Sequence, residues 1–447
     1  MKKILIANRG EIALRIIQTC KEMNIETVAV YSDADKDLPF VKAADEAIHI
    51  GESPVAKSYL QSEVILEAAI NHKVDAIHPG YGLLSENDEF AKKIEQAGIT
   101  FIGPSPQTIE WMGDKIMARK TMQQAGVPIV PGTIEPIGDV EEGIKLAEQI
   151  GYPVMLKASS GGGGIGMVKC ENEEDLHKHF ISSQQRAKNY FGSGRMFIEK
   201  YIENARHIEV QIMGDTHGNI VHLFERDCSI QRRNQKVVEE SPSPFLTESL
   251  RSKITSAAIE AAKAVNYVNA GTVEFVVSEN GDFYFLEMNT RLQVEHPVTE
   301  SITGLDLVRW QIQIAQGEKL PLTQDEIICK GHAIEFRLYA EDPVTFFPSP
   351  GKIEELKWPK MDQVRIDSGY EEGNQVTPFY DPMIAKIIVS DSNRIGCLKN
   401  AKKFFGEIKI SGLKSNVPLF QNLLIEEEFL NGEYTTSFLS KRSVSKP

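Results

Sequence analysis

The segment "EMNTRLQVEHPVTE", residues 287–300, has polar side chains at every second position of its first half. In a β-strand alternate residues share a face, so five of these side chains are predicted to lie together. They are Glu287, Asn289, Arg291, Gln293 and Glu295. Such a face can bind a metal ion or an anion, but the solvated face of an ordinary sheet has the same pattern. The segment alone leaves both interpretations open.

A straight strand cannot bring all five groups to one small ligand. From Glu287 to Glu295 a fully extended chain spans roughly 26 Å. We therefore predict a bend near "VEHP", where Pro297 helps to end the strand pairing.

A second carboxylate is predicted to face Glu287. In "VEFVVSENGDFYFLEMN" two strand-forming runs flank Asn280-Gly281, the favoured pair for a two-residue type I′ turn. Pairing about this turn places Glu274 opposite Glu287, and Thr272 opposite Asn289. Opposed carboxylates repel, which predicts a cation between them, and the amide oxygen of Asn289 favours a hard divalent ion such as Mg²⁺ over a lysine. A raised pKa on one glutamate, or a slipped register, is the alternative.

Two further segments suggest an anion site. "HIEVQ" sets His207, Glu209 and Gln211 on one side of a predicted strand. The run "ERDCSIQRRNQK" follows and includes Arg232, Arg233 and Lys236. In an acidic protein this run favours a pocket for a small anion over a nucleic-acid surface. An ordinary solvated loop that binds no ligand is the alternative.

The glycine run "SSGGGGIGM" lies between the predicted strands "PVMLKA" and "MVKC", with Asn172 placed to cap the next helix. A dinucleotide-binding loop would open a helix at once, and a P-loop would need lysine where Met167 stands. The bare amides can close over phosphate oxygens, although a flexible surface loop would look the same. Combined with Lys115, Lys157, the carboxylate pair and Arg291, the run predicts a site for Mg-ATP.

The elements that position these residues indicate a mixed α/β and α+β protein. The first hundred residues alternate strands and helices, which predicts a doubly wound, Rossmann-like domain over 1–113. In its first helix Ile12, Ile16, Ile17, Cys20 and Met23 form one apolar stripe. The single glycine of "NRGE" disfavours NAD binding. We predict a central domain over 114–320 with a mobile lid at about 131–203, and a C-terminal mixed domain over 331–447.

The amino-acid composition narrows the classes of molecule that the protein is expected to bind. The chain has 447 residues, a net charge of −14 and a pI near 5.3, which disfavours nucleic acid and anionic membranes as partners. It has no signal-peptide core and no run of 18 apolar residues, so a cytoplasmic location is expected. The five scattered cysteines predict neither disulfides nor a zinc site.

The motifs taken together resemble the biotin carboxylase family of ATP-grasp enzymes over nearly the whole chain. They are "IANRGEIA", "HPGYGLLSEN", "RHIEVQ", "ERDCSIQRR", "QKVVEE", "EMNTRLQVEHPVTE" and "PSPGKI". The resemblance implies a ligase in which ATP and bicarbonate form carboxyphosphate, which breaks down to CO₂ and phosphate. Phosphate then removes the ureido proton of biotin, and the nitrogen attacks CO₂.

The resemblance also implies roles for particular residues. Those implied at ATP are Lys115, Lys157, Gly163, Gly164, Glu199, Lys200, Tyr201, Ile202, His207, Gln231, Asn234, Glu274 and Glu287. Those implied at Mg²⁺ or Mn²⁺, with two ions expected, are Glu274, Glu287 and Asn289. Lys236, Arg291 and the backbone of Val294 are implied around bicarbonate, with Glu295 as the base. Arg337 is implied to stabilise the biotin enolate, and Tyr81 to pack near the biotin ring.

Two positions depart from the family pattern. Asn234 stands where many members have histidine, and Ile165 stands in the glycine run where many have a basic residue. The amide of Asn234 can still donate and accept hydrogen bonds. With Ile165 in place of a cation near phosphate, closure of the glycine run over the ligand is expected to weaken by on the order of 1 kcal/mol if that side chain reaches the ligand.

The partners are expected on other chains, because no "AMKM"-like biotinylation motif occurs. The resemblance implies a biotin carboxyl carrier protein, a separate carboxyltransferase and a homodimer. It implies acetyl-CoA carboxylase and fatty-acid synthesis first, with another acyl-CoA or small-molecule carboxylase as the alternative. The rival functions are a different ATP-grasp ligase, a non-catalytic nucleotide-binding module and an NAD-dependent oxidoreductase.

Overall fold

The computed structural model describes residues 1–159 and 167–443. Its N-terminal part is a five-stranded parallel sheet in the order β3-β2-β1-β4-β5, which is a doubly wound arrangement. The elements are β1 (Lys3–Ile6), α1 (Gly10–Glu22), β2 (Glu26–Ser32), η1 (Asp33–Asp35), α2 (Pro39–Ala43), β3 (Glu46–Gly51), η2 (Val55–Lys57), α3 (Ser62–Asn71), β4 (Ala76–His78), α4 (Asp88–Gln96) and β5 (Thr100–Phe101). Helices α5 (Pro106–Gly113) and α6 (Lys115–Gln124) lead into the rest of the chain.

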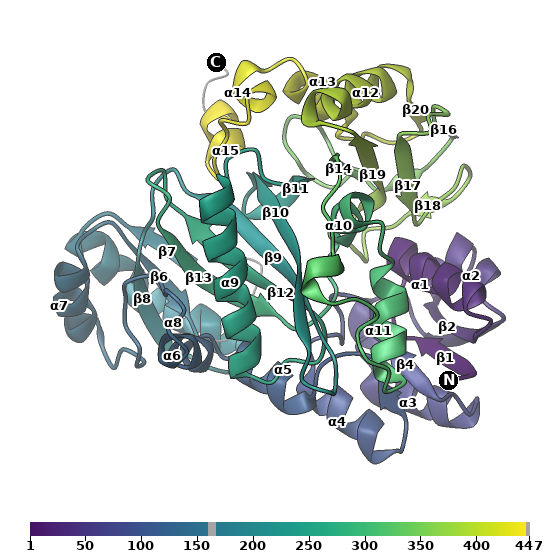
Figure 1. The fold of residues 1–447 in the computed structure, drawn as a ribbon, viewed down its shortest axis with the longest axis horizontal. Helices are drawn as coiled ribbons and strands as arrows, with labels where there is room; N and C mark the ends of the chain where they lie inside the picture. Colours follow the sequence, from purple (N-terminus) through teal and green to yellow (C-terminus); the bar gives the residue numbers. More distant parts are fainter. Residues whose placement is uncertain (160–166, 444–447) are drawn as a thin grey trace.

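Helix α1 is buried along the predicted stripe. Ile12, Ile16, Ile17 and Cys20 are at most 1% exposed, because the helix packs between its own sheet and α11 (Leu307–Ala315). Met23 lies just past the helix end and is only partly buried. In Figure 1 the purple N-terminal domain accordingly lies directly beside the green α11.

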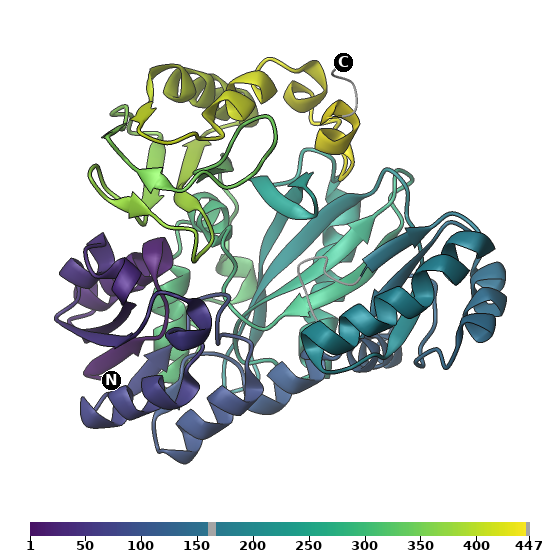
Figure 2. The same cartoon turned by 180° about the vertical axis from the view of Figure 1, so that it is seen from behind.

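A small separate unit follows. It has a three-stranded antiparallel sheet in the order β7-β6-β8 and its own apolar core. Its elements are α7 (Val140–Ile150), β6 (Val154–Ala158), β7 (Met167–Cys170), α8 (Glu173–Phe191) and β8 (Met196–Lys200). The glycine run connects two paired strands, β6 and β7, and the side chain of Asn172 caps α8, as the sequence predicts. Figures 1 and 2 show this unit at one end of the molecule.

The largest sheet has eight strands in the order β13-β12-β9-β10-β11-β14-β19-β17. Five strands come from the central part and three from the C-terminal part, so the sheet continues across the predicted domain boundary. They are β9 (Arg206–Gly214), β10 (Ile220–Arg232), β11 (Gln235–Ser241), β12 (Asn269–Val277), β13 (Phe283–Asn289), β14 (His332–Tyr339), β17 (Val364–Ser368) and β19 (Met383–Asp391).

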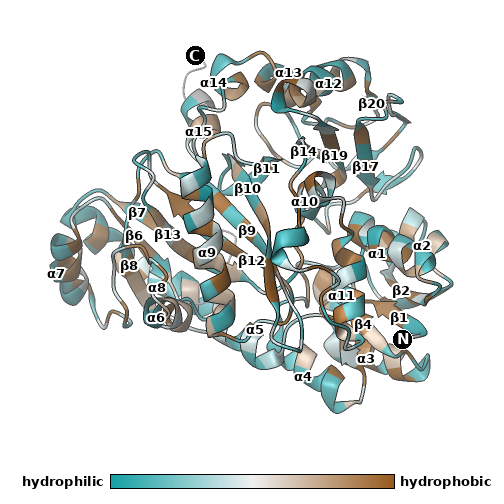
Figure 3. Ribbon diagram, in the orientation of Figure 1, coloured by the Kyte–Doolittle hydropathy of each residue, from teal (hydrophilic) through white to brown (hydrophobic). Residues whose placement is uncertain are grey.

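The central strands separate apolar from polar side chains. Ile208, Val210 and Val273 pack under α9 (Glu248–Ala264), which crosses the sheet in Figure 1 and carries alternating brown and teal bands in Figure 3. On the other face an ionic row crosses four neighbouring strands through directly paired residues. The row is Glu287, Glu274, Glu209 and Arg226.

The hairpin between β12 and β13 corrects one prediction and confirms another. The turn is not a two-residue type I′ turn: Ser278 and Asp282 pair, and Gly281 has a φ of +85°. This longer loop shifts the register by one residue, and an irregularity between Glu274 and Phe275 shifts it back. The predicted pairs Glu274–Glu287 and Thr272–Asn289 therefore do form, because two opposite shifts cancel.

The predicted bend near "VEHP" lies too late in the chain. Strand β13 already ends at Asn289, and a short loop leads to α10 (His296–Thr303). Pro297 lies in the first turn of that helix, where its missing N–H costs nothing, rather than ending strand pairing.

The C-terminal part covers the end of the sheet. Its remaining elements are η3 (Gln324–Glu326), β15 (Gly351–Lys352), β16 (Glu355–Lys357), β18 (Gln375–Val376), α12 (Arg394–Glu407), β20 (Lys409–Ser411), α13 (Val417–Leu423), α14 (Glu427–Leu430) and α15 (Phe438–Ser443). Across the described residues no helix has the length and apolar character needed to cross a membrane. All five cysteines are unpaired, as predicted.

Glu240 on β11 ties the C-terminal segment to the sheet. Its carboxylate accepts hydrogen bonds from His332 at 2.6 Å, from Arg394 at 2.7 and 3.0 Å, and from Tyr434. Burial raises the pKa of Glu240, but the donors and the charge of Arg394 outweigh it and bring the pKa down to about 2. The ionised carboxylate therefore stabilises the folded state.

We expect Glu240→Gln to reduce the free energy of unfolding by about 3 kcal/mol at neutral pH. Because the folded-state pKa lies below the ordinary 4.5, this stabilisation is complete above pH 4.5 and is lost as the pH falls toward 2. Urea unfolding of wild type and variant at pH 7 and pH 4 should show the larger difference at pH 7. Glu248→Gln, at an 89% exposed carboxylate, is the matched control and should change stability by less than about 0.5 kcal/mol.

Candidate active site

A cavity of about 610 Å³ opens above the polar face of the large sheet, between the small unit, the N-terminal domain and β14. Every site residue that the family resemblance implies lines it, apart from those outside the described residues, whereas Glu209, Gln211, Arg232 and Arg233 of the predicted anion site do not. The lining set includes Tyr81, Lys115, Lys157, Glu199, Lys200, Tyr201, Ile202, His207, Gln231, Asn234, Lys236, Glu274, Glu287, Asn289, Arg291, Val294, Glu295 and Arg337. Gly163, Gly164 and Ile165 lie outside the described residues.

Lys236 is the centre of the site. Its Nζ contacts Glu209, Glu274 at 2.9 Å and Glu295 at 2.7 Å, on three different segments. Strand β11 positions this lysine directly after the tight β10–β11 turn, where Arg233 and Asn234 have positive φ. One cation thus holds three buried carboxylates around a single point.

Glu295 is 0% exposed and lies between two cations. Its Oε1 accepts from Lys236, and its Oε2 accepts from Nη2 of Arg337 at 2.9 Å. Burial raises the pKa of Glu295, but the charges of Lys236, Arg337 and Arg226 outweigh burial and hold the pKa well below its usual range. The carboxylate is therefore an anion at neutral pH.

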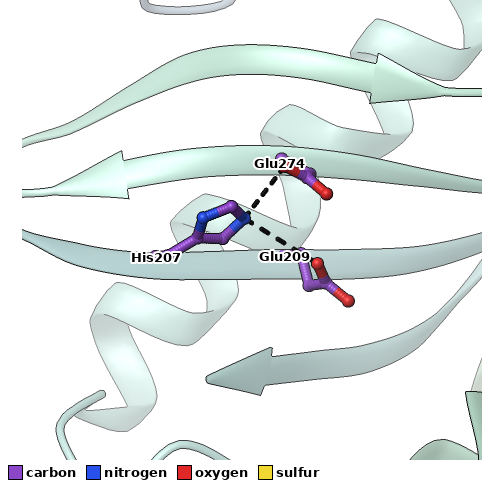
Figure 4. A group of neighbouring side chains, drawn as sticks. All are labelled: His207, Glu209 and Glu274. Atoms are coloured by element: carbon purple, nitrogen blue, oxygen red, sulfur yellow. Dashed lines mark ion pairs between the residues drawn. The ribbon is translucent and has the colours of Figure 1, made fainter. Parts of the chain in front are cut away.

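Glu274 is both a predicted metal ligand and one of the three carboxylates that contact Lys236. Its Oε2 lies 2.9 Å from Nε2 of His207, as Figure 4 shows with the ring placed between β9 and β12. Burial raises the pKa of Glu274, but Lys236 and His207 lower it by more, so the pKa lies well below the usual value. The same contact raises the pKa of His207 against the opposing effect of burial.

Basic side chains compensate the negative charges of the opposed carboxylates Glu274 and Glu287. Lys115 contacts Glu287 at 2.6 Å, while Lys236 and His207 contact Glu274. Lysine stems therefore reach both carboxylates, which the sequence did not predict, while Mg²⁺ at this pair stays a prediction. The slipped register is excluded, since Glu274 and Glu287 pair as predicted, and the pKa of Glu274 is lowered rather than raised.

The cavity wall from the small unit carries a second ionic group. Glu199 on β8 contacts both Lys157 on β6 and Arg119 on α6. Lys200 points the other way and donates to the carbonyls of Gly151 and Tyr152 at 2.8 and 3.0 Å. Neighbouring residues of one strand thus face opposite sides, as the strand period requires.

Arg291 is held by a residue that the sequence reasoning missed. Its Nε donates to Glu86 at 2.7 Å, and the other oxygen of Glu86 accepts from the backbone N–H of Thr290 at 3.1 Å. The remaining donors of Arg291 contact Asn289 at 2.9 Å and Gln293 at 3.0 Å. The N-terminal domain therefore orients a guanidinium that belongs to the central part.

We expect Glu86→Gln to loosen Arg291, because the ion pair becomes a neutral hydrogen bond while the size stays the same. If Arg291 binds an anionic substrate, the KM for that anion should rise about three- to tenfold while the affinity for nucleotide stays unchanged. Steady-state kinetics with the anion varied at saturating nucleotide measures this. An unchanged KM would show that Arg291 does not depend on Glu86.

Other missed residues are mostly apolar. Val130, Met155, Met167 and Leu286 line the cavity, but in the sequence such residues cannot be told from core positions. Thr436, Ser437 and Ser440 come from the C-terminal segment, which the backbone bond from Thr436 to Ala205 ties down at 2.9 Å. No motif signals that segment.

Family models match three consecutive parts of the chain. The model described as biotin carboxylase, N-terminal domain, matches residues 1–109. The model described as carbamoyl-phosphate synthase L chain, ATP binding domain, matches residues 114–323. The model described as biotin carboxylase C-terminal domain matches residues 335–441.

Known proteins are similar over the full length. A biotin carboxylase of Halalkalibacterium halodurans is 58% identical over 98% of this chain and 97% of its own. A crystal structure described as a biotin carboxylase-beta-gamma-ATP complex from Campylobacter jejuni is 47% identical and covers 98% of both chains with a TM-score of 0.97.

A third relative is part of an enzyme with a different overall reaction. It is the biotin carboxylase domain dimer of 2-oxoglutarate carboxylase from Hydrogenobacter thermophilus, with MgADP, ADP and bicarbonate. It is 48% identical, covers 99% of this chain and 97% of its own, and has a TM-score of 0.96. The three domain matches and the full-length identities agree: this chain is an ATP-grasp ligase that belongs to the biotin carboxylase family.

Proposed function

We propose that this cavity carboxylates biotin with ATP and bicarbonate, and that Glu295 is the base that takes the bicarbonate proton. One observation carries the proposal: a fully buried, ionised Glu295 lies between Lys236 and Arg337 in the cavity that Arg291 also lines. Bicarbonate bound by Lys236, Arg291 and the backbone of Val294 brings a second negative charge close to Glu295. Like charge raises the pKa of a carboxylate, so substrate binding itself makes Glu295 a better base.

ATP is assigned to the wall between the small unit and the sheet. The apolar side chains of Met155, Met167 and Leu286 suit a purine, with Glu199 to Ile202 beside it. Lys115, Lys157 and His207 then face the phosphates. For Lys115 and Lys157 this means exchanging a carboxylate partner, Glu287 or Glu199, for a phosphate oxygen.

Glu274, Glu287 and Asn289 would hold Mg²⁺. The donor set fits: two carboxylates pair directly across β12 and β13, and an amide oxygen follows two residues later, all hard oxygen ligands. Among the residues that the structure describes, the Nδ2 atom of Asn289 is buried without a hydrogen-bond partner, so it remains available to donate to an anionic ligand such as a phosphate oxygen. The ion would neutralise phosphate charge, and Lys115 and Lys236 would be freed to bind anions.

Arg337 is assigned to the biotin enolate, and Tyr81 to the ring. Deprotonating the ureido nitrogen places negative charge on the ureido oxygen, which a guanidinium stabilises. Arg337 is held by Glu239 at 2.6 Å as well as by Glu295, so its position does not depend on the substrate.

The carrier, the carboxyltransferase and the homodimer are proposed from the relatives. A chain named simply biotin carboxylase is matched over 97% of its length, and the Hydrogenobacter structure is described as a dimer. We propose acetyl-CoA as the first acceptor to test, and pyruvate, 2-oxoglutarate and other acyl-CoA thioesters as the alternatives. A 2-oxoglutarate carboxylase domain at 48% identity means that overall similarity does not select the acceptor.

The test is phosphate release from Mg-ATP by the purified protein, with bicarbonate present or rigorously removed and free biotin added or withheld. Release that requires bicarbonate and increases with biotin supports the proposal. Release indifferent to both contradicts it and favours another ATP-grasp ligase. The acceptor follows from adding carrier and carboxyltransferase from the same cell and measuring transfer of labelled carbonate to each candidate.

A further inference from the structure

Lys386 is a buried cation that the reaction as described above does not use. It lies on β19 with 0% of its side chain exposed, although lysine is almost never fully buried unless it is paired. On β14 its directly paired residue is Arg337, and on β17 it is Asp367. Two adjacent strands thus present two cations side by side at the edge of the proposed biotin site.

The ammonium group joins three parts of the chain. Its Nζ donates to the carbonyl oxygen of Val294 at 2.9 Å and pairs with Glu11 of α1 at 3.1 Å. The nearest oxygen of Asp367 is farther away, at 3.9 Å. The other oxygen of Glu11 accepts from the hydroxyl of Tyr81. One side chain of the C-terminal part therefore contacts the central loop directly and reaches the N-terminal domain through a carboxylate.

Val294, which Lys386 contacts directly, and Tyr81, which it reaches through Glu11, form one wall. Val294 and Tyr81 line the main cavity, and both also line an adjoining cavity of about 410 Å³, together with Arg337. The Val294 segment is a loop between β13 and α10, with no strand pairing of its own at this residue. Its backbone orientation therefore depends on contacts such as the one from Lys386.

We propose that Lys386 is a positioning residue for bicarbonate: by holding the Val294 carbonyl it fixes the orientation of the backbone that faces this substrate. Glu11 supplies the counter-charge that allows the lysine to stay buried. The inference rests on the proposed function, since it requires bicarbonate at Val294. It extends that function to a residue that touches neither substrate.

The test compares two variants that differ only at Lys386. Glu11→Gln keeps the lysine, and Lys386→Met combined with Glu11→Gln removes it without leaving an unpaired buried carboxylate. We expect the bicarbonate KM of the double variant to be about tenfold above that of Glu11→Gln, the size expected for losing a hydrogen bond from a charged donor. The affinity for MgADP without bicarbonate should agree within about twofold.

Equal bicarbonate KM values in the two variants would overturn the role of Lys386, and so would a parallel loss of nucleotide affinity, which would indicate a merely structural residue. Lys386→Met alone is the second variant. Burial already raises the pKa of Glu11 against the effect of Lys386, so without the lysine this carboxyl can take up a proton and the chain can still fold. Lys386→Met alone should show the same rise in the bicarbonate KM as the double variant. Wild-type phosphate release without bicarbonate dependence would instead contradict the proposed function itself.

Discussion

Replacing Glu295 with glutamine is expected to lower bicarbonate-dependent phosphate release by about 10²- to 10⁴-fold, the usual contribution of a general base. Glutamine keeps the size and one acceptor oxygen but cannot take a proton. Lys236 and Arg337 retain Glu274, Glu209 and Glu239 as partners, so the fold and the affinity for ATP should remain. Stopped assays of phosphate, with nucleotide binding measured separately, test both halves of the expectation.

Glu239→Gln is the matched control. Glu239 also contacts Arg337 and is 0% exposed, but it does not line the cavity. Burial and the charge of Glu295 raise its pKa to about 7, despite Arg337, so glutamine resembles a form that is already populated. Its turnover should fall less than about tenfold, since one charge-assisted hydrogen bond weakens and no proton acceptor is lost. Similar losses in both variants would show that the two glutamates act only by holding Arg337.

Lys236→Met should be the most destabilising single change in the site, because it leaves three carboxylates around a position with no cation. Breaking a buried ion pair from one side costs roughly 3–5 kcal/mol, and here the charge is shared among Glu209, Glu274 and Glu295. Turnover should be lost as well. Lys57→Met, at an exposed pair with Glu52, is the control and should change stability by less than about 1 kcal/mol.

The pH dependence identifies the cause. Removing the lysine raises the folded-state pKa values of the three carboxyls, so the ionised carboxylates stabilise the variant less than they stabilise the wild type. The resulting loss of stability is greatest above those raised values and shrinks as the pH falls. The difference in Tm between wild type and variant should therefore be larger at pH 8 than at pH 6. A difference independent of pH would point to lost packing instead.

Much of the site could be predicted because its residues lie on regular elements with readable periods. The strand period placed His207 and Glu209 on one side of their strand and Glu274 opposite Glu287. In the structure Glu209, Glu274 and Glu287 are directly paired across three strands, and His207 is paired with Val276. The predicted α/β fold with an ATP-grasp region is confirmed by the family and structure matches. The pairing of Glu274 with Glu287 was correct although the predicted turn was wrong, because local rules do not foresee a second, compensating irregularity.

What the sequence did not reveal lies in contacts between distant segments. Glu86 meets Arg291 across 205 positions, and Lys386 meets Val294 across 92. No periodicity links such residues, since each side chain belongs to an element whose own pattern is complete without the partner. The cations at Glu274 and Glu287 were missed for a related reason: the long stems of Lys115 and Lys236 reach the carboxylates from other elements.

The eight-stranded sheet also determines where this chain can be divided. A cut between residues 320 and 331 would fall in a connecting segment, yet it would separate β11 from β14, which pair through Val238–Phe336 and the three residue pairs that follow. Strand β11 would then present unpaired N–H and C=O groups along an edge, and such edges promote association with other chains. The first fragment would also lack Arg337. A chimera that exchanges C-terminal domains between relatives must therefore preserve this strand register, whereas the small unit with its own sheet and core could be exchanged as a separate piece.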